Sequence, residues 1–81
     1  MIISVELSYY PLHEEYKKPI LQFIDDLKQN KNLTVRKNTM ATQVFGEFEE
    51  VMATITNCIS KAFTLPHSVF VMKVINADLR D

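Results

Sequence analysis

Residues 33–46 read LTVRKNTMATQVFG, and this stretch decides the predicted fold. It holds two short β-prone runs, LTVRKN and TMATQVFG, which meet around Asn38 and Thr39. This pattern predicts an antiparallel hairpin whose second strand extends from Asn38 to Gly46. That strand mixes threonine hydroxyls and a glutamine amide with apolar residues. A strand that only fills a core does not need such groups, so we expect them to serve recognition.

A helix and a further strand flank this hairpin on each side. Residues 2–10 alternate between apolar and more polar side chains, which predicts a strand with one face packed inward. Apolar residues recur at helical spacing over 16–29 and again over 47–63. Residues 68–75, SVFVMKVI, predict the last strand. The order β-α-β-β-α-β predicts one α+β domain covering residues 1–81, a ferredoxin-like sandwich with a four-stranded antiparallel sheet and both helices on one face.

The alternation predicts which side chains pack between sheet and helices. Ile3, Val5 and Leu7 are expected to face the helices. This leaves the alternate residues on the open face: Ser4, Glu6, Ser8 and Tyr10. The helices are expected to contribute Phe23, Ile24, Leu27, Val51, Met52, Ile55 and Ile59 to the core. For the third strand, either the set with Met40, Thr42 and Val44 or the set with Thr39, Ala41, Gln43 and Phe45 could join the open face. Composition does not decide between the two sets.

Composition and charge narrow the possible partners. The formal net charge is −1, which gives no broad electrostatic reason to bind nucleic acid or an anionic membrane. The third strand also lacks the basic and stacked aromatic residues of an RNA-recognition module. No apolar stretch approaches the roughly 20 residues that span a bilayer, and the N-terminus lacks the features of a signal peptide. The expected location is the cytoplasm.

The search for catalytic chemistry finds little. Cys58 is the only cysteine, so an internal disulfide is impossible, and a zinc site would need scattered ligands. His13 and His67 fall in expected loops without an evident carboxylate partner. The single glycine, Gly46, cannot build a phosphate-cradling loop. We therefore expect a protein that is not an enzyme and that needs no metal or cofactor.

Two short segments resemble a known family. SYYPL, from Ser8 to Leu12, and MATQVFGE, which contains Ala41 to Gly46, are similar in sequence and spacing to the small thiamine-binding family. Its members include a binder of thiamine and of its hydroxymethylpyrimidine precursor. Ala41 departs from the serine found in some members, while Thr42 keeps the threonine of the pattern. The resemblance implies a non-catalytic binding protein for thiamine or its pyrimidine moiety.

The chemistry of such a ligand indicates candidate residues. An aminopyrimidine offers a donor amine and acceptor ring nitrogens, which Ser8, Asn38 and Thr42 could pair with, while its flat ring favours apolar or aromatic contact. Glu6 could balance a thiazolium cation. The expected ligand site, placed on the open sheet face near a subunit interface of a homodimer or homotetramer, comprises Glu6, Ser8, Tyr10, Asn38, Met40, Thr42, Phe70 and Met72. Two alternatives remain open: an oligomerising interaction module, and a regulatory domain that senses another small molecule.

Overall fold

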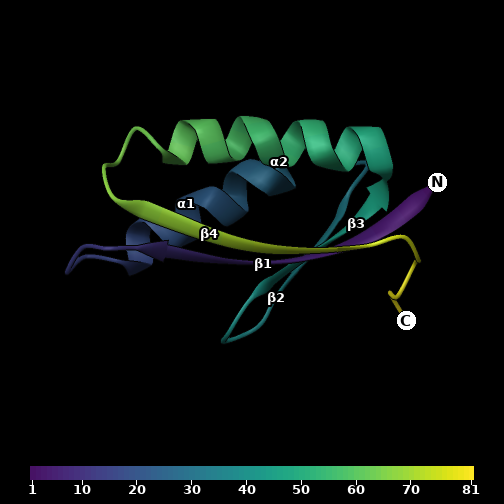
Figure 1. Cartoon of the computed structure of the whole chain (residues 1–81), viewed down its shortest axis with the longest axis horizontal. Coiled ribbons are helices and arrows are strands. Elements are labelled where there is room, and N and C mark those ends of the chain that lie inside the picture. The colour runs from purple at the N-terminus through teal and green to yellow at the C-terminus, as the bar shows by residue number, and fades with distance from the viewer.

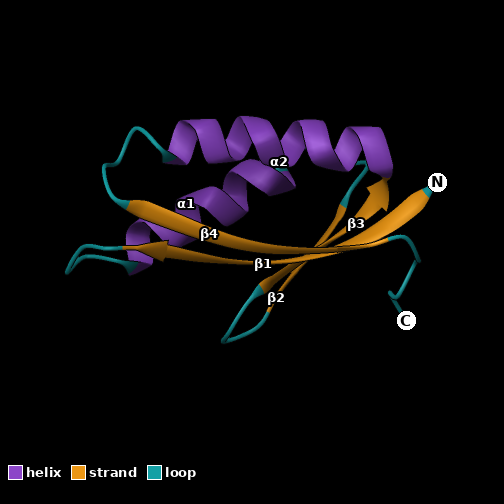
Figure 2. Ribbon diagram, viewed as in Figure 1, coloured by secondary structure: helices purple, strands orange, loops and turns teal.

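The computed structural model describes residues 1–81 and contains four strands and two helices (Figure 1). In chain order these elements are β1 (Ile2–Pro11), α1 (Lys17–Lys28), β2 (Thr34–Lys37), β3 (Thr42–Glu47), α2 (Phe48–Ala62) and β4 (Ser68–Ile75). The strands form one sheet in the order β2-β3-β1-β4, and every neighbouring pair is antiparallel. Both helices lie over the same side of this sheet (Figure 2). The predicted ferredoxin-like α+β fold is confirmed.

The core lies between the sheet and the helices. Ile3, Val5 and Leu7 are all buried there, as the alternation of β1 predicts. Of the helical residues expected in the core, Phe23, Ile24, Leu27, Val51 and Ile55 are buried, whereas Met52 and Ile59 are only partly buried at its margin. No helix is long and apolar enough to cross a membrane.

The β2–β3 hairpin differs from the prediction at its turn. β3 begins at Thr42, not at Asn38, because residues 38–41 form the turn. The Asn38 side-chain Oδ1 accepts hydrogen bonds from the main-chain N–H groups of Met40 and Ala41, both at 2.8 Å. Asn38 N–H donates in turn to the Ala41 carbonyl at 3.0 Å. An asparagine that hydrogen-bonds within its own turn in this way delays the start of β3 to Thr42.

The register places Thr42 on the helix-covered face. In the β1–β3 ladder Thr42 lies opposite Leu7, and directly paired residues of antiparallel strands project to the same face. In the β1–β4 ladder Phe70 lies opposite Tyr9 and Met72 opposite Leu7, so these two share that face. The expectation that Thr42, Phe70 and Met72 lie on the open face is therefore wrong.

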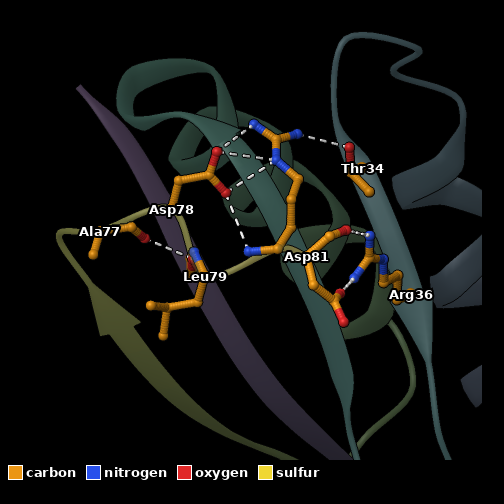
Figure 3. A network of polar contacts seen from close by, with 8 residues as sticks. Thr34, Arg36, Ala77, Asp78, Leu79 and Asp81 are labelled. Atoms are coloured by element: carbon orange, nitrogen blue, oxygen red, sulfur yellow. Dashed lines mark hydrogen bonds and ion pairs between the residues drawn. The ribbon is translucent and has the colours of Figure 1, made fainter.

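The other face of the sheet is partly covered by the chain itself (Figure 3). Ser4 projects to this face and is only 5% exposed, because its Oγ donates to the Ala77 carbonyl at 2.6 Å and accepts from the Leu79 N–H at 2.8 Å. Arg36 forms an ion pair with Asp81 at 2.8 Å. The C-terminal segment 76–81 thus lies over part of the face that the sequence predicts to be uncovered.

Candidate functional site

A cavity of about 360 Å³ lies between α1, the second half of β1 and the β2–β3 turn, and we call it the α1 groove. Five of the eight predicted site residues line it: Ser8, Tyr10, Asn38, Met40 and Thr42. Its volume falls within the range of about 300–1,000 Å³ that is typical of small-molecule sites. The structure therefore brings most of the predicted set together, at a different place from the one expected.

The groove exists because β1 extends beyond the point where its pairing with β3 ends. The last residue pair between β1 and β3 is Leu7 with Thr42, whereas β1 continues to Pro11. From Ser8 onward, the edge of β1 that would face β3 has no strand beside it. Side chains from both faces of β1 can reach this open edge, which explains why Ser8 and Tyr10 line the same groove as Thr42.

The open edge presents main-chain groups of Tyr9. Phe48 N–H bonds to the Met1 carbonyl on the β3 side, and Leu12 N–H bonds to the His67 carbonyl on the β4 side. Because hydrogen-bonded pairs alternate along antiparallel strands, odd-numbered β1 residues direct their N–H and C=O groups toward β3. Tyr9 would pair with Met40, but no main-chain hydrogen bond joins the two. Its donor and acceptor are thus unpaired in the groove wall.

Thr42 adds a hydroxyl to this wall. Its side chain is only 7% exposed, yet its hydroxyl makes no hydrogen bond within the protein. No fully buried side-chain nitrogen or oxygen in the structure lacks a partner, so this hydroxyl retains solvent contact. A nearly buried polar group that opens onto a cavity without a partner is suited to pair with a ligand, because burying it unpaired would cost free energy.

Asn38 and Ser8 have partly structural roles. The Oδ1 of Asn38 is occupied by the turn, but its amide nitrogen makes no hydrogen bond and remains a free donor. The Ser8 hydroxyl donates to the Met40 carbonyl at 3.4 Å, which is long for an O–H···O bond. Both groups can therefore serve a ligand without the loss of a strong internal contact.

Apolar and aromatic side chains surround these polar groups. Ile20 and Phe23 of α1 line the groove from the helix side, and Met40, which is 84% exposed, lies at its rim. Tyr10 and Tyr16 are half exposed and also line it. Tyr16 was not among the predicted residues. It lies just before α1, and the end of β1, the start of α1 and the β2–β3 turn all meet at this end of the fold.

The remaining three predicted residues lie elsewhere. Glu6 is on the opposite sheet face, where its carboxylate pairs with Lys73 at 3.3 Å. Phe70 stacks on Tyr9 with ring centroids 4.3 Å apart and also contacts Phe23 at 5.0 Å, so it belongs to an aromatic cluster of the core. Met72 is on the helix-covered side of edge strand β4 and lines no cavity.

The groove has few charged groups. No aspartate or glutamate lines the groove, and its only charged residue is Lys37. Away from the groove, burial in α2 raises the pKa of the Cys58 thiol, which keeps it protonated near neutral pH. No group of three histidine, cysteine, aspartate or glutamate residues lies close enough together to hold a metal ion. The described groups therefore favour binding through hydrogen bonds and ring contacts.

Solved structures of other proteins share this architecture. No protein-family model matches the chain, and no curated protein matches it either. A hypothetical protein from Methanocaldococcus jannascii superimposes with a TM-score of 0.83 at 20% identity, over 99% of this chain and 84% of that one. A "putative thiamine biosynthesis/salvage protein" from Thermotoga maritima gives 0.84 at 18% identity, over 95% and 85%.

A third structure extends the same likeness. A domain of unknown function, DUF77, from Bacillus cereus has a TM-score of 0.73 at 10% identity, over 98% of this chain and 79% of that one. At these identities the likenesses show a shared fold. The class that fold and groove define is thus a small ferredoxin-like α+β protein with a partly apolar groove between helix α1 and the β2–β3 turn.

Proposed function

We propose that this protein is a non-catalytic binding protein for a small heteroaromatic ligand of the hydroxymethylpyrimidine type. The observation that carries the proposal is the unpaired hydroxyl of nearly buried Thr42, which opens onto the α1 groove beside the unpaired main chain of Tyr9. Together they offer a hydroxyl, an N–H donor and a C=O acceptor over a short distance. No cofactor is required for this role.

The ligand chemistry fits this set of groups. An aminopyrimidine has an exocyclic amine that donates and ring nitrogens that accept, so it can pair with the C=O and N–H of one strand residue at the same time. In the proposed pose the amine donates to the Tyr9 carbonyl, and the Thr42 hydroxyl pairs with a ring nitrogen. The flat ring packs against Phe23, with Met40 and Tyr16 at the rim.

Two further observations support this ligand class. The segments from Ser8 to Leu12 and from Ala41 to Gly46, which carry the sequence resemblance, both contribute residues to the groove. One solved protein with the same fold is the "putative thiamine biosynthesis/salvage protein" from Thermotoga maritima. These are independent of the hydrogen-bonding argument.

Among related ligands, the neutral pyrimidine fits better than thiamine. Thiamine carries a thiazolium cation, which Glu6 was expected to balance. Glu6 instead pairs with Lys73 on the opposite face, and no carboxylate lines the groove. A cation bound beside Lys37 would meet like charge, so we propose that hydroxymethylpyrimidine binds more tightly than thiamine.

A thermal-shift screen tests the proposal directly. Ligands that bind the native state raise the melting temperature by mass action, so hydroxymethylpyrimidine, thiamine, amino acids and nucleotides are compared at equal concentration. We expect the largest shift with the pyrimidine. A shift with amino acids alone would favour the sensing alternative, and no shift with any ligand would favour the interaction module.

The protein is also proposed to assemble as a homodimer or homotetramer. Strand β4 is an edge of the sheet, and its outer side has no partner strand. Val71, on the open face of β4, is 60% exposed, and Val69 beside it on that face is also exposed. Unpaired edges and apolar patches of this kind are usually covered in native proteins, and a second copy of the chain would cover them.

A further inference from the structure

A second cavity adjoins the α1 groove. That cavity, of about 420 Å³, is lined by six residues: Lys17, Ile20, Leu21, Lys37, Asn38 and Thr39. Four of them, Ile20, Lys37, Asn38 and Thr39, also line the groove. The two cavities therefore lie side by side between the start of α1 and the β2–β3 turn, and a ligand in the groove lies next to the residues that line the second one.

The combined lining of the two cavities is rich in cationic groups and hydrogen-bond donors. Neither Lys17 nor Lys37 takes part in any ion pair of the structure, although the chain forms five others. No aspartate or glutamate lines either cavity. The free amide nitrogen of Asn38 and the hydroxyl of Thr39 add two uncharged donors. In a chain with a formal net charge of −1, this is a local excess of positive charge.

The register of the β2–β3 ladder places one of these lysines beside Thr42, which is proposed to bind the ligand ring. Lys37 lies directly opposite Thr42 in the β2–β3 ladder, so the two side chains project to the same face. Paired side chains of this kind begin about 4.5–5.5 Å apart at Cβ, and the lysine stem then reaches outward from the threonine. A ligand whose ring is held at Thr42 would thus direct a substituent of a few atoms toward the Lys37 ammonium.

We infer that the groove selects a phosphorylated ligand: a phosphate monoester of the heteroaromatic alcohol, with its ring at Thr42 and its phosphate between Lys17 and Lys37. A phosphomonoester carries close to two negative charges and three acceptor oxygens near neutral pH, which match two ammonium groups and neighbouring donors. This inference rests on the proposed function, because it assumes that the ring occupies the groove.

The test compares the alcohol with its ester. Titration calorimetry measures the affinity of hydroxymethylpyrimidine and of its phosphate monoester for the parent protein, for the double variant Lys17→Gln/Lys37→Gln and for Lys18→Gln. Lys18 is the matched control, because it lies in the same helical turn but lines a different cavity between α1 and the end of α2. All three lysines are exposed, so the variants should fold normally.

We expect the ester to bind the parent at least about 10-fold more tightly than the alcohol, and this preference should weaken as salt rises. The double variant should lose the preference and keep its affinity for the alcohol, while Lys18→Gln should behave like the parent. Equal affinity for the two ligands, or equal loss in Lys18→Gln, would overturn the phosphate inference and leave the proposed function standing. If neither ligand binds the parent, both are overturned.

Discussion

Thr42 lies directly opposite Leu7, one of the most deeply buried residues of the core, and yet its own hydroxyl has no partner in the protein. The two side chains project to the same side of the sheet. Leu7 is covered by the helices, whereas Thr42 sits where β3 starts and the groove opens. A polar group at the boundary between core and cavity should matter little for folding and much for binding.

Thr42→Val separates these two roles. Valine keeps the β-branched shape and removes only the hydroxyl, so no internal hydrogen bond is lost and the free energy of unfolding should change by less than about 0.5 kcal/mol. Binding of the pyrimidine should weaken by about 1–3 kcal/mol, or roughly 5-fold to 150-fold in affinity, because a ligand group is left unpaired. Calorimetric titration and urea unfolding of the same preparations measure both quantities. Unchanged affinity would mean that Thr42 is only a β-forming residue.

Glu6→Gln is the control from the opposite face. If Glu6 balanced the thiazolium cation, as the sequence suggests, this variant would weaken thiamine binding more than pyrimidine binding. In the structure Glu6 pairs with Lys73 on the far side of the sheet from Thr42, so the variant should bind both ligands as the parent does. A selective loss of thiamine affinity in Glu6→Gln would indicate that the ligand lies on the open face after all.

The fold could be predicted from the sequence because its main signals are periodic and local. The apolar stripes place both helices within a residue or so of their observed ends, and the alternation of β1 gives the correct inward face. The parity of β3 could not be predicted, because Val44 and Phe45 are adjacent and both are buried. Phe45 is on the open face, where Arg36 and Arg80 lie 5.4 and 6.0 Å from its ring centroid. The two arginines and the C-terminal segment bury Phe45 on the open face. From the sequence alone, an apolar residue buried in this way cannot be distinguished from one buried in the core.

The candidate site was only partly predictable for a related reason. Sequence reasoning selected residue types, and five of the selected residues do meet in the α1 groove. It could not find the unpaired main chain of Tyr9, because this depends on where β3 starts relative to β1. The one usable signal was Asn38, whose preference for turns could have placed the start of β3 at Thr42.

Gly46→Ala should destabilise the protein. A Cβ atom at this position would lie 2.8 Å from Leu33 Cδ2 and 3.1 Å from Val51 Cγ2, and both of those residues are buried. Overpacking of this kind costs about 1–3 kcal/mol in free energy of unfolding, which a urea titration measures. In the double variant with Leu33→Ala the shorter of these two contacts is removed, so the combined loss should be smaller than the sum of the single losses. Strict additivity would contradict the packing argument.

Glu50 makes a pH-dependent contribution to stability. Its Oε1 accepts hydrogen bonds from the side-chain amides of Asn32 at 2.9 Å and Asn30 at 3.1 Å, and these bonds hold the pKa of Glu50 below its ordinary value of 4.5. A lowered pKa in the folded state means that the contribution is complete above that ordinary value and is lost as pH falls through the folded pKa. Glu50→Gln should therefore flatten the fall in stability below about pH 4.5. The Glu49 side chain makes no hydrogen bond, so Glu49→Gln should keep the parent's dependence of stability on pH in the same series of urea titrations.

Ser4→Ala should release the C-terminal segment. The Ser4 hydroxyl holds that segment twice, through the Ala77 carbonyl and the Leu79 N–H. Its removal should cost about 1–2 kcal/mol of local stability, seen as faster hydrogen exchange at Leu79 with little change at Leu7. Because the groove lies on the other face, ligand affinity should stay within about 2-fold of the parent. Exchange at Leu79 as slow as in the parent would show that other contacts of segment 76–81 are sufficient to hold it.

Val71→Lys tests the proposed assembly through β4. Val71 lies opposite Ser8 on the open face and is already well exposed, so lysine should not unfold the protomer. A charged lysine on an edge strand opposes pairing with a second sheet, because the ammonium group would have to lose its hydration at the interface. Sedimentation velocity should show a dimer or tetramer for the parent and a monomer for Val71→Lys. It is run at tens of micromolar, roughly the concentration at which a dimer with a micromolar dissociation constant is populated. Lys28→Gln, an exposed change at the far end of α1, should sediment as the parent does. A parent that sediments as a monomer would overturn the assembly proposal, and an oligomer that survives Val71→Lys would place the interface away from this face of β4.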